Sequence, residues 1–323
     1  MAQNSTILFP FLNRTSITML DENNEPVKAL FMRPEAGRSA ADMNYMMSTI
    51  EFTLFTTKRP EGIVVKNAEH LKASTFDPKK TVKFITHGWL SSGTSDTCVT
   101  IKDGYLNNFG ANVIIMNWHE IAKDYCYFTP MDFVPKVAHH YAAFINDMIR
   151  NLAVDPKKVH LIGHSLGAHV SGLVWKDMEG RKPGRVTGLD PAFPGFDHII
   201  MFNDRISKES ADFVDIIHSC GGLLGILDPL GHADFYPNGG VATQPGCSDF
   251  QEACSHGRSW NYFADSVLYP DRKFRTMRCD SWDEFLYQKC NKSENVMMGE
   301  EVSHTARGKY FLRTNKKRPF AIR

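Results

Sequence analysis

The sequence predicts an α/β fold with a mostly parallel central sheet flanked by helices. Three observations support this prediction: short apolar runs alternate with helix-like segments, residues 133–152 carry a helical period, and residues 159–174 have the pattern of strand, tight turn and helix. Strands that alternate with helices favour a parallel sheet covered on both faces. With 323 residues, the chain is long enough to bury a large core as one or two domains.

The expected strands are short and rich in apolar and β-branched residues. They are residues 50–56, 81–85, 112–116, 159–162, 185–189 and 211–218. A helix is expected over residues 98–109. A longer one covers residues 133–152, where apolar side chains recur at three- and four-residue steps and Asp155-Pro156 ends the pattern.

The domain organisation follows from composition along the chain. Residues 1–47 are polar and irregular, so we expect an N-terminal arm with little regular structure. Residues 48–323 contain no internal repeat, low-complexity linker or clean break, so we predict one domain there.

No run approaches the roughly 18 apolar residues of a membrane span. The formal net charge of +1 gives no electrostatic reason to expect a nucleic-acid partner.

The cysteines and the N-terminus bear on the cellular compartment. Of the seven cysteines, the pairs Cys247/Cys254 and Cys279/Cys290 are close enough in sequence to form small disulfide loops. Residues 7–12 are apolar but lack a preceding basic region, so no signal peptide is predicted. The chain then begins near a mature terminus, or the protein is not secreted. The pairing of the other three cysteines stays open: Cys98, Cys126 and Cys220. Three sequons would accept glycans in a secretory compartment: Asn4, Asn13 and Asn291.

The strand-like run from residue 159 leads into a G-x-S-x-G sequence at residues 163–167. After a strand and before a helix, this sequence is typical of a nucleophile elbow, which exposes its serine at the carboxyl edge of a sheet. Ser165 is therefore the candidate nucleophile. The plainer interpretation is a helix start with a serine cap.

A serine nucleophile needs a base and a third group that orients the base. In the order Ser, acid, His, the acid is expected after the next strand, where Asp190 lies 25 residues beyond Ser165. We choose His256 as the base because we expect it on an exposed loop beside Cys254, just before a helical pattern. The plainer interpretations are a turn aspartate before proline and a surface or core histidine. The downstream histidines considered are His198, His218, His232 and His256.

Two backbone N–H groups are candidates for an oxyanion hole. One belongs to Leu166, directly after the nucleophile, and the other to Trp89, in the loop after the strand at residues 81–85. Gly88 keeps the backbone of this loop close to the reacting carbonyl. The plainer interpretation is an ordinary loop with a buried tryptophan.

Several motifs together resemble the animal pancreatic-type lipase family, which includes lipoprotein lipases and phospholipases A1. They are residues 85–89 (ITHGW), 163–169 (GHSLGAH), 188–192 (GLDPA), 211–218 (ADFVDIIH), 231–240 (GHADFYPNGG), 244–247 (QPGC) and 254–256 (CSH). The resemblance covers roughly residues 50–320. It implies an α/β-hydrolase fold, hydrolysis of lipid carboxylic esters and usually secretion, and it supports Ser165, Asp190 and His256 as a triad.

The sequence departs from the family pattern in ways that bear on substrate. The family's lid matches Cys247 to Cys254, with only six residues inside, and the preceding loop at residues 219–231 is short and apolar. Both features resemble the phospholipase A1 branch. Ser207 and Ser210 stand where the family's calcium loop carries aspartates, so we expect no metal. Members with a C-terminal β-sandwich continue further, so we expect a catalytic domain only.

The predicted function is hydrolysis of lipid carboxylic esters at a membrane or lipid surface, as a phospholipase A1 or related neutral lipase, in an extracellular setting and without a cofactor. The acyl chain is expected along apolar side chains of two loops. Two alternatives are a catalytically silent lipid-binding or yolk-type storage protein and a small-ester esterase. The presence of all three triad residues favours an enzyme. The predicted acyl-chain contacts are Phe193, Phe196, Leu223 and Leu224.

Overall fold

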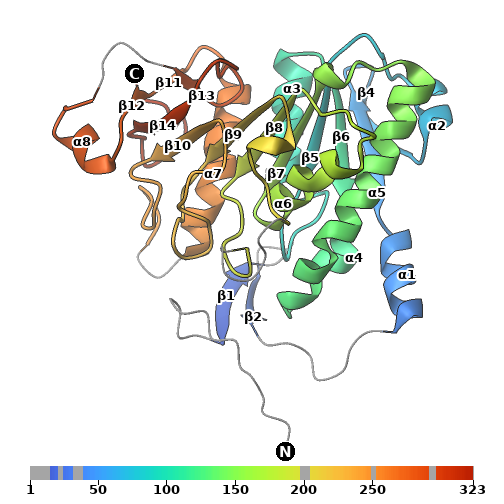
Figure 1. Ribbon diagram of the computed structural model, residues 1–323, viewed down its shortest axis with the longest axis horizontal. Helices are drawn as coiled ribbons and strands as arrows, with labels where there is room; N and C mark the ends of the chain where they lie inside the picture. Colours follow the sequence, from blue (N-terminus) through green and yellow to red (C-terminus); the bar gives the residue numbers. More distant parts are fainter. Residues whose placement is uncertain are drawn as a thin grey trace, which may run out of the picture.

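A ten-stranded sheet forms the centre of the molecule (Figure 1). The computed structural model describes residues 15–20, 25–31, 39–196, 204–248, 252–290 and 296–322. In spatial order the strands are β12 (Met277–Arg278), β14 (Gly308–Leu312), β10 (Ala233–Pro237), β9 (Phe213–Ile217), β8 (Arg185–Leu189), β7 (Val159–His164), β5 (Val82–Thr86), β6 (Asn112–Asn117), β3 (Glu51–Thr56) and β4 (Arg59–Val65).

The sheet is parallel from β14 across to β6, whereas β12, β3 and β4 pair antiparallel with their neighbours. All residues of β5, β8, β9 and β10 are buried, as expected for strands covered on both faces. The predicted α/β fold with a mostly parallel sheet is confirmed, and β8 spans the residues predicted for it. The connectivity is that of an α/β-hydrolase.

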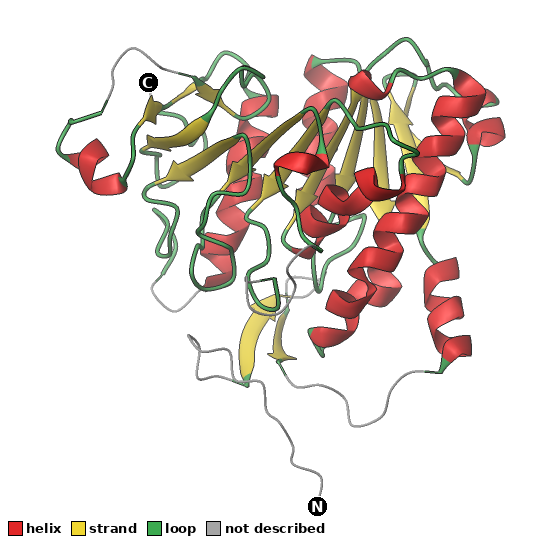
Figure 2. Ribbon diagram, viewed as in Figure 1, coloured by secondary structure: helices red, strands yellow, loops and turns green. Residues whose placement is uncertain are grey.

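Helices cover both faces of the sheet (Figure 2). The described helices are α1 (Ala40–Ser48), α2 (Ala68–Lys72), α3 (Asp96–Asn108), α4 (His119–Ala122), α5 (Phe128–Leu152), α6 (Leu166–Leu173), α7 (Glu252–Leu268) and α8 (Trp282–Leu286), with three short 3-10 turns, η1 (Pro156–Lys158), η2 (Val174–Asp177) and η3 (Lys208–Ser210). Helices α5 and α6 pack on one face with Phe84 and Leu161, and α3 and α7 pack on the other with Ile85 and Ile162.

Helix α5 begins five residues before the predicted start, at Phe128 rather than at residue 133. Pro130 is the third helical residue, and proline is tolerated there because a first-turn N–H has no acceptor within the helix. The helix ends at Leu152, and the next residue, Ala153, caps it in a left-handed conformation with φ 52°. The predicted helical period therefore captured the body of α5 and missed its first turn.

The described residues before position 48 are more regular than we expected. β1 (Ser16–Leu20) and β2 (Pro26–Leu30) form an antiparallel hairpin. Helix α1 begins at a capping box, in which the Ser39 side chain accepts from Asp42 N and the Asp42 carboxylate accepts from Ser39 N. β1 lies against α7, at the end of the sheet where β7 and β8 finish (Figure 1).

Both predicted disulfides are present, Cys247–Cys254 and Cys279–Cys290. Cys98, Cys126 and Cys220 lie outside them. A small second sheet joins β11 (Phe274–Arg275) to β13 (Met297–Met298). The three sequon asparagines lie outside the described residues. Within the described ranges, no helix has both the length and the apolar character needed to cross a membrane.

Candidate active site

Ser165 occupies a sharp turn between β7 and α6, as predicted. Its backbone has φ 57° and ψ −123°, a region that side chains other than glycine rarely adopt and that is costly to hold. A side chain at Gly163 would overlap the Gly167 carbonyl, and one at Gly167 would overlap the carbonyls of Thr86 and His87. The two glycines therefore allow the turn to close tightly on β5, which places Ser165 at the carboxyl edge of the sheet.

Asp190 follows β8 and is completely buried. Its Oδ2 accepts a hydrogen bond from His256 Nδ1 at 2.6 Å. Its Oδ1 accepts from the backbone N–H groups of Ser219 at 2.7 Å and Cys220 at 3.1 Å. An ionised carboxylate can only accept hydrogen bonds, and such charge-assisted bonds are the strong ones. Three donors thus fix the carboxylate and direct one oxygen to the His256 ring.

His256 lies in helix α7, which begins at Glu252, and is 4% exposed. The prediction that it lies on an exposed loop is therefore wrong. The apolar helical period begins only at Trp260, because the preceding turn carries polar or small residues, so sequence periodicity hides the start of the helix. Within the helix, the His256 carbonyl accepts from Ser259 Oγ at 3.0 Å.

His164, the residue before Ser165, contacts His256 and so links the serine turn to α7. The ring of His164, which precedes Ser165, lies 4.7 Å from the His256 ring, and His164 Nε2 is 3.3 Å from the His256 carbonyl oxygen, to which it donates. Burial, reinforced by nearby His256, lowers the pKa of His164 well below its usual range, so this ring is neutral. Among the described contacts, no hydrogen bond joins Ser165 Oγ to His256. Catalytic hydrogen bonds are often long before substrate binds.

The His87-Gly88-Trp89 loop lies directly beside Ser165. A Cβ atom placed on Gly88 would be 2.7 Å from Ser165 Cβ, so only glycine permits this approach. His87 Nδ1 lies 3.0 Å from the Gly88 carbonyl oxygen, and Nε2 lies 2.9 Å from Asn117 Oδ1 and 3.1 Å from the Trp118 backbone nitrogen. Burial lowers the pKa of His87 to about 4, so the ring is neutral near pH 7.

The contact between His87 Nδ1 and the Gly88 carbonyl orients the second candidate oxyanion donor, the Trp89 N–H. The peptide between Gly88 and Trp89 is planar and trans, so the Trp89 N–H points away from the side on which His87 holds the carbonyl. Leu166 is the first residue of α6, and its N–H has no acceptor within the helix. Sequence analysis proposed both donors but assigned no role to His87 and His164, whose contacts join separate strand ends.

The predicted acyl-chain residues differ in how much surface they leave uncovered. Phe193 and Leu223 are half-buried, whereas Leu224 is buried. Phe196 is fully buried, and its ring stacks on His169 at 3.8 Å. Phe193 N donates to the Leu224 carbonyl at 2.8 Å, so the two loops that carry these residues lie side by side.

The other candidate histidines have structural partners. His218 Nε2 is bonded to Asp234 at 3.0 Å, and its Nδ1 donates to the Ile226 carbonyl at 2.7 Å. His232 Nδ1 accepts from Val214 N at 3.0 Å. His198 lies outside the described residues, as does part of the segment between Cys247 and Cys254.

The two serines at the calcium-loop position cap the short η3 turn. Ser207 Oγ accepts from Glu209 N at 3.3 Å, and Ser210 Oγ accepts from Ser207 N at 3.0 Å. In the part of the chain that the structure describes, no three His, Cys, Asp or Glu side chains gather where they could hold a metal ion.

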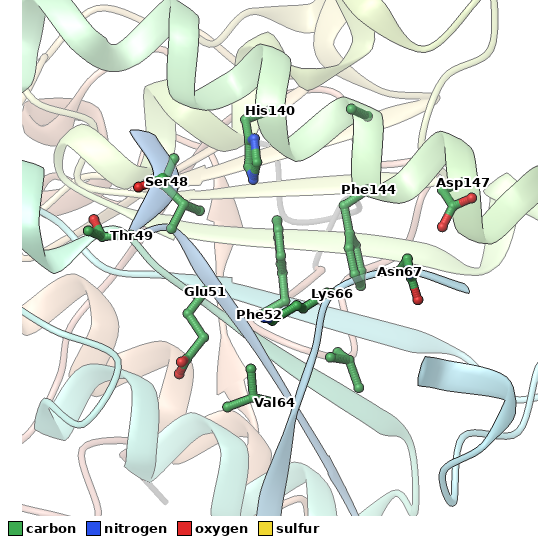
Figure 3. Close-up of a pocket in the computed structure, with 13 residues that line it drawn as sticks. Ser48, Thr49, Glu51, Phe52, Val64, Lys66, Asn67, His140, Phe144 and Asp147 are labelled. Carbon is green, nitrogen blue, oxygen red and sulfur yellow. The ribbon is translucent and has the colours of Figure 1, made fainter. Parts of the chain in front are cut away.

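A surface cavity of about 690 Å³ lies away from this site, between α5 and the last two strands of the sheet, β3 and the edge strand β4 (Figure 3). Phe52 lines this cavity, and its ring stacks on two rings of α5. The ring centroids are 4.1 Å apart for Phe144 and 6.1 Å apart for His140. The lining includes none of Ser165, Asp190 and His256. This cavity therefore does not belong to the candidate active site.

Comparison with known proteins agrees with this geometry. The family model described as Lipase matches residues 16–320. Human and mouse lipoprotein lipase are each 30% identical over 322 aligned residues, which cover 88% of this chain and 67% of theirs. The pig protein of the same name is 32% identical over 267 residues, which cover 74% of this chain and 55% of its own. The chain belongs to the lipase family of α/β-hydrolases.

Proposed function

We propose that this protein hydrolyses lipid carboxylic esters with Ser165 as nucleophile, His256 as general base and Asp190 as the group that orients the base. The observation that carries the proposal is the buried 2.6 Å bond from His256 to Asp190, at the same sheet edge as the strained Ser165 turn. Among the described residues, Ser165 is the serine with a positive φ, so a structural pair such as His218 and Asp234 lacks a nucleophile held in this way.

The geometry suggests a two-step reaction. Asp190 holds the proton on His256 Nδ1, so Nε2 is the nitrogen that takes the proton from Ser165 Oγ as Oγ bonds to the ester carbon. The N–H groups of Trp89 and Leu166 stabilise the oxyanion, and each such donor is typically worth about 10²–10³ in rate. His256 then returns the proton to the leaving alcohol. Water enters by the same route and releases the fatty acid from the acyl-enzyme.

The finer proposal is an acyl hydrolase like phospholipase A1. The lid between Cys247 and Cys254 has six residues inside it, too few for a helical cover, so we infer that long-chain phospholipids reach the site without interfacial activation. Phe193 and Leu223 are the better acyl-chain contacts, because Phe196 is already covered by His169. We further propose one domain over residues 48–323 and an extracellular location, since disulfides persist in oxidising compartments.

A headgroup panel tests the substrate assignment. We expect wild-type protein to release fatty acid from long-chain phosphatidylcholine vesicles. With a shorter-chain, micelle-forming phosphatidylcholine, we expect the rate to rise smoothly as its concentration passes the aggregation threshold. Ser165→Ala is the control for each lipid. A sharp rise at the threshold would count against the minimal lid. Turnover of short-chain esters alone would identify an esterase, and no turnover of any ester would favour a lipid-binding or storage protein.

A further inference from the structure

The N-terminal hairpin meets the loop that carries the candidate oxyanion donor. Phe31, directly after β2, is 3% exposed, and its ring centroid lies 6.0 Å from that of Trp89. Tyr127 closes the cluster, edge-on to Phe31 at 5.5 Å and to Trp89 at 5.0 Å. The Trp89 side chain is therefore packed against one residue from the N-terminal segment and one from the segment before α5.

Backbone hydrogen bonds fix Phe31 in this position. Leu30 N donates to the Tyr125 carbonyl at 2.8 Å, and Tyr127 N donates to the Leu30 carbonyl at 2.9 Å. Leu30 and Cys126 thus form a parallel bridge between the end of β2 and the segment before α5. Phe31 N also donates to the Thr15 carbonyl at 2.8 Å, which ties it to the start of the hairpin.

The same segment before α5 holds Trp89 by its polar edge. Trp89 Nε1 donates to the Asp124 carbonyl at 2.7 Å, and the next residue, Leu90, donates its N–H to the Ala122 carbonyl at 2.9 Å. Leu90 adopts φ 52°, a conformation that an unsupported loop would leave. The loop after β5 therefore depends on this anchor, and Phe31 closes the anchor from the side of the hairpin.

We propose that Phe31 is a positioning residue for the oxyanion hole: by packing on the Trp89 ring, the N-terminal hairpin holds the Trp89 N–H toward Ser165. This inference rests on the proposed function, because it takes Trp89 as an oxyanion donor. Phe31 acts through Trp89 and touches no reacting atom. Its contribution grows as charge develops on the oxyanion, so it affects kcat and leaves substrate binding nearly unchanged.

Phe31→Leu tests the inference against a matched control, Phe52→Leu. Phe52 is likewise 3% exposed and in contact with an aromatic ring, but it lies in β3, next to the edge strand β4 and beside the cavity of Figure 3. Phe31→Leu is expected to lower kcat about tenfold, part of the 10²–10³ that a whole donor supplies, with KM within twofold of wild type. Phe52→Leu is expected to leave kcat within twofold of wild type.

The second readout is inhibition by an alkyl boronic acid, whose tetrahedral serine adduct places an oxygen in the oxyanion hole. The Ki of this inhibitor is expected to rise about tenfold in Phe31→Leu. Phe31→Tyr keeps a ring of the same size on Trp89 and should leave kcat and Ki close to those of wild type. Phe31→Met replaces Phe31→Leu if the latter does not fold. If kcat and Ki match those of Phe52→Leu, the hairpin has only a structural role. If Ser165→Ala retains turnover, the proposed function itself fails.

Discussion

Ser165→Ala is expected to lower kcat for ester hydrolysis by about 10⁶-fold, the loss seen when a triad nucleophile is removed. Alanine has no hydroxyl to attack the carbonyl, yet it fits the same turn, because Ser165 is 8% exposed and its side chain forms no described hydrogen bond. Fatty-acid release in a pH-stat measures the rate, and the thermal midpoint should stay close to that of wild type. Residual turnover above about 1% would contradict the assignment of Ser165 as nucleophile.

Ser171→Ala is the matched control for this substitution. Ser171 lies in α6, the helix that begins directly after Ser165; it is fully buried, and its hydroxyl has no hydrogen-bond partner among the described residues. Removing it deletes a serine oxygen from the same helix without touching the triad. We expect kcat to stay within about twofold of wild type. Removing a buried hydroxyl that forms no hydrogen bond leaves no other polar group unpaired, so it costs little free energy.

Asp190→Asn is expected to lower kcat by about 10⁴-fold, as an amide in place of a triad carboxylate does. The amide oxygen can still accept from Ser219 N and Cys220 N, so the fold is expected to persist. The amide nitrogen can only donate to the His256 ring, which favours the wrong tautomer and leaves an imidazolium uncompensated. Steady-state kinetics near neutral pH measures the loss.

The second buried His–Asp pair provides the control for Asp190→Asn. Asp234 accepts from His218 Nε2 at 3.0 Å and from Leu230 N at 2.8 Å, so Asp234→Asn removes a carboxylate with similar bonds. It is expected to lower the thermal midpoint while kcat falls less than about tenfold, since no triad group is lost. Equal losses of kcat in Asp190→Asn and Asp234→Asn would show that Asp190 has only a structural role.

Sequence analysis predicted best those features that are encoded in local patterns. The apolar runs of β5 and β8 and the period of α5 predicted buried strands and a long helix, and the glycines around Ser165 predicted the turn. The Ser, Asp, His order predicted that Asp190 and His256 meet, because strands β7 and β8 are neighbours and finish at the same edge.

The remaining features depend on contacts between distant segments. The hairpin before residue 31 is stabilised where Leu30 pairs with Cys126 and Phe31 packs on Trp89, and no local pattern contains those partners. The same holds for the charge in β8, where Arg185 is buried because Asp215 on β9 accepts two hydrogen bonds from it at 2.8 Å. A charged residue can be predicted to lie in a buried strand only once the residue that pairs with its charge is known.

The central claim is that Ser165 accepts the acyl group, and covalent trapping tests it most directly. Incubation with a long-chain alkyl fluorophosphonate, followed by peptide mass spectrometry, should find one adduct on the peptide that contains Ser165, with activity lost in proportion to labelling. Ser165→Ala should remain unlabelled, because among the described serines only Ser165 occupies a strained turn with positive φ, at the sheet edge where Asp190 holds His256. An adduct on a different residue, or full ester turnover with Ser165 completely labelled, would contradict the account.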